Sequence, residues 1–195
     1  MSGSPSTRRF GRGVEHFDIE AFGADFAYTL DGAELGRIDD ETFSASEVRI
    51  RIEGLSVHPG TSKGKMVNAI KLASRLIGRL PQGSCSPETT DAREGFIHPH
   101  RFTGTTAEAE LRFIARDFDS AKLAEHEQLL RRLADELAAE EPRARISVTV
   151  EEQYRNMKEF LEAIRRWPKP PTRLRGAAGS SRGASRSAAA PTVRC

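Results

Sequence analysis

The sequence predicts an α+β domain, a ferredoxin-like two-layer sandwich with two helices on one face of a four-stranded antiparallel sheet. Apolar and polar residues alternate in four segments, which is typical of half-buried strands. In two further segments, apolar residues recur at helical spacing. The order β-α-β-β-α-β is the split βαβ arrangement, and about 110 residues suffice to build its core. Strands are expected at 46–54, 96–103, 107–116 and 144–152, and helices at 65–80 and 120–140.

The first strand and the first helix are separated by a turn rich in Gly and Pro. Val48, Ile50 and Ile52 occupy every second position of the strand, so they share one face of a sheet. A shorter strand, Ala24 to Asp31, is expected earlier in the chain, where Asp31-Gly32 signals a turn. The apolar residues of the first helix are Met66, Ala69, Ile70, Ala73, Leu76, Ile77 and Leu80.

The second half of the domain shows equally regular patterns. Gly104 makes a tight link between the second and third strands. Asp119 is a suitable N-cap for the second helix, and Pro142 ends that helix before the last strand. The apolar stripe of this helix consists of Leu123, Leu130, Leu133 and Leu137.

Charge is distributed unevenly along the chain. Residues 164–195 carry eight of the 30 Lys and Arg residues and none of the 28 Asp and Glu residues, so the preceding part has a net charge of −6. The composition of this tail cannot bury a core, and we expect it to be disordered. Its cations would bind phosphates weakly and with strong salt dependence. The expected strands expose Arg, Glu and Ser in place of base-stacking aromatic residues, so no nucleic-acid partner is expected.

The chain shows no sequence signal for a membrane or for secretion. No apolar run approaches the roughly 18 residues that span a bilayer, and residues 1–13 contain no apolar segment typical of a secretory signal. Cys85, in an expected loop, and Cys195, at the last position, offer no disulfide framework. We therefore expect a cytoplasmic protein without a membrane partner.

His58 is the first candidate functional residue. It opens the turn between the first strand and the first helix, where a side chain is directed outward from a rigid element. A phosphate-binding loop needs four residues between its glycines and then Lys-Ser/Thr. Here three residues separate Gly60 from Gly64, and Met66 follows Lys65, so that motif is not met. A surface histidine that merely holds the turn remains the alternative.

Six segments form a recognisable set: His16–Ala24, Ala27–Gly32, Val57–Ala69, Arg93–Phe96, Arg116–Asp119 and Tyr154–Met157. In their order and spacing, over about residues 11–163, they resemble the peptidase T family of zinc-dependent tripeptide aminopeptidases. In that family a ferredoxin-like lid domain mediates dimerisation and closes over the peptide substrate, beside a catalytic domain that carries the metals. The resemblance therefore implies a homodimer formed through the lid domain, and a peptide as the substrate.

The resemblance also divides the chain into parts. Residues 44–153 correspond to the peptidase dimerisation (lid) domain. Residues 14–43 correspond to a remnant of the metallopeptidase catalytic domain, and residues 154–163 to the start of the return into that domain.

Three residues receive roles from the resemblance. Asp31 falls on a zinc-ligand aspartate, His58 on a lid histidine that stabilises the oxyanion in the partner subunit's active site, and Arg116 on an arginine that helps hold the peptide carboxylate. A hard carboxylate ligand, an imidazole donor and a guanidinium fork suit these tasks. Taken alone, Asp31-Gly32 would be a simple turn, and Arg116 could form a structural salt bridge.

The chain departs from the family where the metal site should be. The family has Asp-Glu-Glu, which includes the general base and a metal ligand, before Gly-Arg-Gly. Here Thr7-Arg8-Arg9 precedes Gly11-Arg12-Gly13. The codons GAC GAG GAG, read one base late, encode Thr-Arg-Arg, so we expect residues 1–13 to be frameshifted and disordered. The tail, residues 164–195, also has the composition of out-of-frame translation.

These departures limit the expected function. His98 and His100 have same-face strand spacing but lack a third ligand, so we expect them to be surface residues. Asp31 alone cannot hold two zinc ions, and no general base remains. The chain is expected to be a fragment of a peptidase T-like tripeptide aminopeptidase that does not bind zinc stably and is inactive alone. The alternative is a non-catalytic dimerisation or binding module.

Overall fold

The computed structural model describes residues 18–23 and 41–163. The chain divides into two units between residues 37 and 38. In the first unit, α2 (Ile19–Phe22) begins where the Asp18 carboxylate accepts the N–H of Ala21 at 2.8 Å. All other described elements belong to the second unit.

Several predictions concern residues outside the described ranges. These are the strand expected at 24–31, the segment 1–13 and the tail 164–195. Within the described ranges, no helix is long and apolar enough to cross a membrane.

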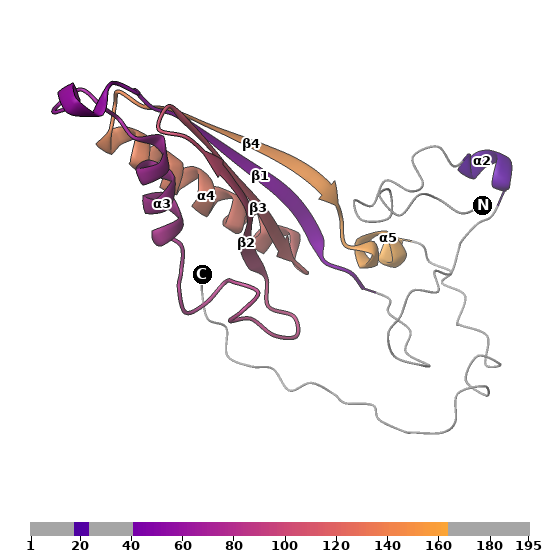
Figure 1. The fold of residues 1–195 in the computed structure, drawn as a ribbon. Coiled ribbons are helices and arrows are strands. Elements are labelled where there is room, and N and C mark those ends of the chain that lie inside the picture. The colour runs from indigo at the N-terminus through magenta and orange to yellow at the C-terminus, as the bar shows by residue number, and fades with distance from the viewer. Residues whose placement is uncertain (1–17, 24–40, 164–195) are drawn as a thin grey trace. The chain divides into compact units, whose positions relative to one another are not determined.

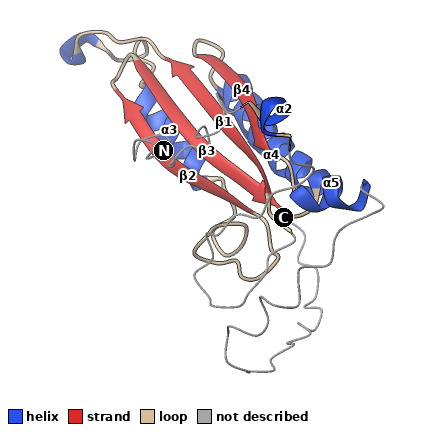
Figure 2. Ribbon diagram, turned by 90° about the vertical axis from the view of Figure 1, so that its right-hand side faces the viewer, coloured by secondary structure: helices blue, strands red, loops and turns tan. Residues whose placement is uncertain are grey.

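The second unit contains β1 (Ser44–Glu53), η1 (Pro59–Thr61), α3 (Ala69–Gly78), β2 (Phe96–Gly104), β3 (Glu108–Asp117), α4 (Ser120–Glu140), β4 (Arg145–Tyr154) and α5 (Met157–Ala163). The strands form an antiparallel sheet in the order β2-β3-β1-β4. Figures 1 and 2 show α3 and α4 on one face of this sheet. The predicted ferredoxin-like α+β fold is confirmed.

The first helix is shorter than predicted. Asn68 has an extended backbone (φ −87°, ψ 110°), and its side-chain oxygen accepts the N–H of Lys71 at 3.3 Å. This N-cap starts α3 at Ala69 and not at residue 65. The apolar stripe shifts accordingly, because Leu72 is buried whereas Ile70 is 37% exposed.

The second helix has the predicted bounds. Asp119 is its N-cap, as predicted, and accepts the N–H of Ala121 at 2.8 Å. The four predicted leucines are buried, and His126 and Ala134 are buried with them.

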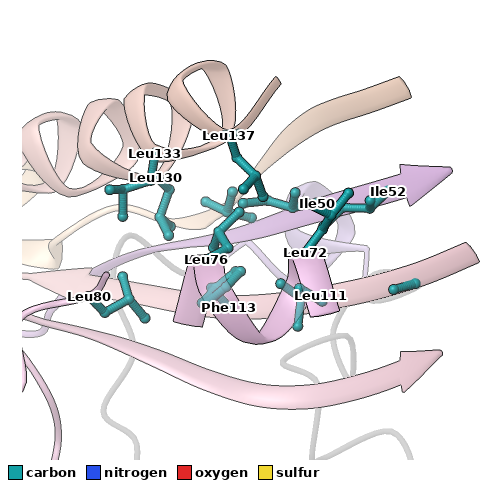
Figure 3. Close-up of a cluster of buried hydrophobic side chains, with 14 of the residues drawn as sticks. Ile50, Ile52, Leu72, Leu76, Leu80, Leu111, Phe113, Leu130, Leu133 and Leu137 are labelled. Carbon is teal, nitrogen blue, oxygen red and sulfur yellow. The ribbon is translucent and has the colours of Figure 1, made fainter. Parts of the chain in front are cut away.

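The apolar core lies between the sheet and the two helices. Phe113 of β3 is fully buried there, together with Ile50 and Ile52 of β1. Figure 3 shows the leucines of α3 and α4 directed toward these strand residues. Removal of this apolar surface from water is the dominant favourable term in folding. The leucines labelled are Leu72 and Leu76 of α3, Leu80 just after α3, Leu111 of β3, and Leu130, Leu133 and Leu137 of α4.

Cys85 lies between α3 and β2 and is buried. Its backbone adopts φ +56°, and its C=O accepts the N–H of Ile97 at 2.8 Å.

A buried histidine–aspartate pair joins β3 to α4. His126 Nε2 lies 3.2 Å from Asp117 Oδ2, and both side chains are 4% exposed. Asp117 Oδ1 accepts the N–H of Asp119 at 2.9 Å. Gly95 packs so closely that a Cβ at its position would lie 2.0 Å from Asp117 Oδ2. Any side chain at position 95 would therefore displace the carboxylate.

We expect Gly95→Ala to lower the free energy of unfolding by about 1–3 kcal/mol, because the added methyl group overpacks the site of the Asp117 carboxylate. Gly83→Ala is the matched control, since a Cβ at Gly83 meets nothing within 4 Å. Such open positions change stability by about 0.5 kcal/mol or less. Urea unfolding followed by circular dichroism measures both variants, and equal stabilities would contradict the prediction.

Candidate functional site

His58 is exposed and forms the N-cap of η1. Its Nδ1 accepts the N–H of Gly60 at 3.2 Å, and its backbone C=O accepts the N–H of Thr61 at 3.0 Å. The histidine therefore holds the turn, as one of the two sequence interpretations predicted. These bonds leave the Nε2 atom of His58 without a hydrogen-bond partner among the described residues.

The turn between β1 and α3 is anchored at its base and along its second limb. Leu55 and Val67 exchange backbone hydrogen bonds of 2.8 and 3.0 Å. A Cβ at Gly54 would lie 2.3 Å from the Val67 carbonyl oxygen, so only glycine permits this approach. Arg143 Nη1 donates to the Gly64 carbonyl oxygen at 3.1 Å. The turn is thus presented from a fixed base.

Arg116 lies near the end of β3, on the sheet face opposite α3 and α4. Its guanidinium carbon lies 6.0 Å from the centroid of the Phe96 ring. Its Nε is buried without a hydrogen-bond partner, and no described carboxylate forms an ion pair with it. The structural salt bridge considered for Arg116 therefore has no acidic partner within the described residues. A guanidinium that has no acidic partner among the described residues suits an anion.

His58 and Arg116 lie at opposite ends of the domain. Arg116 pairs with Ala45 near the start of β1, whereas His58 follows the end of β1. Figure 1 shows the turn before α3 far from the start of β1. A strand of this length spans roughly 30 Å at a rise of about 3.4 Å per residue. One copy of the chain cannot bring both residues to the same small ligand.

Asn156 ties together the chain segments that enter and leave the domain, and we call its surroundings the joint. Asn156 is 2% exposed. Its Oδ1 accepts the N–H groups of Thr42 at 3.2 Å and Lys158 at 3.0 Å. Its Nδ2 donates to the Phe118 carbonyl oxygen at 3.0 Å, and its backbone N–H donates to Ser44 Oγ at 2.9 Å. The segment that enters the domain and the segment that leaves it are therefore both hydrogen-bonded to Asn156.

An ion pair completes the joint. Arg93 Nη2 donates to Glu41 Oε1 at 2.8 Å, and Arg93 Nη1 donates to Oε2 of the same carboxylate. The guanidinium lies 4.7 Å over the ring of Phe118. The hydrogen bond from Arg93 lowers the pKa of Glu41 against the opposing effect of burial, and Asn156 and Lys158 add to the lowering.

The described residues do not fit a zinc site. They contain no group of three or more His, Cys, Asp or Glu side chains that could hold a metal ion. His98 and His100 have ring centroids 6.3 Å apart, beside a shift in the register between β2 and β3. Burial lowers the pKa of His100. The predicted ligand Asp31 lies outside the described residues.

Residues 41–145, more than half of the chain, match the sequence pattern of the peptidase dimerisation domain family. The chain belongs to the peptidase dimerisation domain family. The match begins at Glu41, the carboxylate bound in the joint, and it includes β1 to β3 with both covering helices.

Relatives named peptidase T match a longer stretch. The chain is 43% identical over 155 residues to peptidase T of Bacillus pumilus (strain SAFR-032). It is 44% identical over 155 residues to peptidase T of Lysinibacillus sphaericus (strain C3-41). Each match covers 80% of this chain, which spans only 38% of the length of the relative. The resemblance to peptidase T is therefore confirmed.

Solved structures share the fold. Aminopeptidase PepT from Bacillus cereus ATCC 10987 has a TM-score of 0.62 at 22% identity, over 84% of this chain and 47% of that one. A tripeptidase from Staphylococcus aureus subsp. aureus Mu50 has a TM-score of 0.63 at 22% identity, over 76% of this chain and 40% of that one. At these identities the likeness shows the fold alone.

The burial of two polar residues, His126 and Asn156, was not predicted from the sequence. His126 carried a usable signal, because it lies three positions after Leu123 and four before Leu130, on the apolar stripe. Asn156 belongs to the Tyr154–Met157 segment that carries the resemblance, but nothing in the sequence indicated its bonds to Thr42 and Ser44, which lie 114 and 112 positions earlier.

Glu41→Gln should destabilise the protein at pH 7 and have less effect in acid. The folded-state pKa of Glu41 lies below the ordinary value of 4.5. Its ionised form therefore stabilises the fold above about pH 4.5, and this contribution is lost as the pH falls through the lower folded-state pKa. Thermal unfolding of both proteins at pH 7 and pH 3 tests this, because the difference in Tm should shrink at pH 3.

Arg93→Ala is the partner control, since it removes the other half of the same ion pair. The double variant should lose less than the two single variants together, because both changes break one interaction. A Tm difference between wild type and Glu41→Gln that stays constant from pH 7 to pH 3 would refute the predicted link between the ionisation of Glu41 and stability.

Proposed function

We propose that the chain is the dimerisation (lid) part of a peptidase T-like tripeptide aminopeptidase. The 155-residue match to peptidase T, together with the fold of the dimerisation domain family, carries the proposal. In it, residues 44–153 are the lid, residues 14–43 a remnant of the catalytic domain and residues 154–163 the start of the return. The joint at Asn156 supports this division, because the chain must enter and leave an inserted lid domain at one place.

In this proposal His58 and Arg116 act on the substrate. His58 donates a hydrogen bond from Nε2 to the oxyanion that develops on the scissile carbonyl. Arg116 binds the carboxylate of the tripeptide, a role supported by its lack of an acidic partner among the described residues. A tripeptide is at most roughly 11 Å long, whereas β1 separates the two residues by roughly 30 Å. Both can serve one site only if they come from two copies.

The proposal therefore includes a homodimer formed through residues 44–153. Two observations support it: the family is that of a dimerisation domain, and His58 and Arg116 lie at opposite ends of one copy. Each copy would contribute its His58 to the site that contains Arg116 of the other copy.

The chain is not expected to hydrolyse peptides alone. Zinc is the metal of the parent family in this proposal, with Asp31 as one ligand. The general base and a second ligand of that family are replaced here by Thr7-Arg8-Arg9. Within the described ranges, no three-ligand cluster compensates for this loss.

Incubation of the purified chain with a tripeptide and zinc should release no N-terminal amino acid. A full-length peptidase T, assayed in parallel by chromatography of the products, is the positive control. Zinc-dependent release by this chain that disappears in the Asp31→Ala variant would overturn the proposed inactivity.

The alternative function, a non-catalytic dimerisation module, is supported by the family match alone. It also predicts a homodimer. Size-exclusion chromatography with light scattering should give a particle of twice the 21.5 kDa chain mass at tens of micromolar. Dilution should shift the population toward the monomer by mass action. A clean monomer at the higher concentration would contradict both the dimer and the shared site built from two copies.

A further inference from the structure

The imidazole of His58 lies directly against the backbone of Gly60. The Nδ1 atom accepts the Gly60 N–H at 3.2 Å. A Cβ on residue 60 would lie 3.3 Å from both Cε1 and Nδ1 of the ring, closer than side chains ordinarily approach. A side chain at position 60 would therefore require the ring to give way by a few tenths of an ångström.

This hydrogen bond decides where the proton of the neutral ring sits. A ring nitrogen that accepts a hydrogen bond must carry a lone pair, so the proton of neutral imidazole is on the other nitrogen. In His58 that nitrogen is Nε2, which has no partner among the described residues. The exposed edge of the ring is therefore a hydrogen-bond donor.

The turn that carries the ring is anchored at two places. The Leu55–Val67 bridge closes the base of the turn, and Arg143 holds Gly64 on its second limb. The charged side chains on this turn and on the segment that contacts it are Lys63, Lys65 and Arg143, together with Glu141, which forms an ion pair with Arg143 at 2.7 Å. Within the described part of the chain, none of them forms a hydrogen bond with His58.

We propose that Gly60 is a positioning residue that holds His58 as the Nε2–H tautomer, so that the ring acts as a donor and not as a base through Nδ1. The consequence for catalysis rests on the proposed function, because it is the peptide oxyanion that would receive this hydrogen bond. The geometry of the ring and its tautomer do not depend on that function.

Long-range proton–nitrogen NMR of the full ¹⁵N-labelled chain tests the proposal. In the wild type, Nε2 of His58 should give the signal of a protonated nitrogen and Nδ1 that of a nitrogen with a lone pair. A His58→Ala variant removes the acceptor, so the Gly60 amide signal should shift in that variant. Gly64, in the same turn, is the internal control and should not shift.

Gly60→Ala and Gly83→Ala form the matched pair of variants. The methyl group at position 60 should displace the ring, lengthen the hydrogen bond from the residue-60 amide to Nδ1 and raise the population of the Nδ1–H tautomer. Gly83→Ala, where a Cβ has open space, should leave all His58 signals unchanged. A proton on Nδ1 in the wild type, or unchanged ring and amide signals in Gly60→Ala, would overturn the proposal. Neither outcome bears on peptidase activity or dimerisation, so failure here is distinguishable from failure of the proposed function.

Discussion

Antiparallel pairing of β1 with β3 on one side and with β4 on the other holds the domain together. A strand paired on both sides has its backbone donors and acceptors satisfied, which allows it to be buried. Val48, Ile50 and Ile52 place its apolar face fully under the helices. The same strand also acts as a rigid spacer, since its length sets the separation between His58 and Arg116.

The two ends of this sheet are built differently. At the end where the chain enters and leaves, Asn156 and the Glu41–Arg93 pair form a dense polar joint whose central side chain is buried. At the other end, backbone contacts anchor an exposed turn that carries His58.

The fold class could be predicted because both periodicities are local properties of the chain. The start of α4 followed from one residue, Asp119, whose cap acts within two positions. The start of α3 was missed by four residues because the apolar pattern continues upstream of Asn68, where the backbone already forms a turn.

The features of the candidate site also fall into those that the sequence determined and those that the tertiary structure decided. The sequence alone determined that the chain forms a ferredoxin-like domain, that His58 lies in a turn between a strand and a helix, and that the segments around it resemble peptidase T. Only the tertiary structure decided that Arg116 has no acidic partner among the described residues, that His58 and Arg116 cannot meet in one copy, and that Gly95 must lack a side chain beside Asp117. The reason is physical: periodicity and capping act over a few residues, whereas these facts depend on strands and loops that the fold brings together from distant parts of the chain.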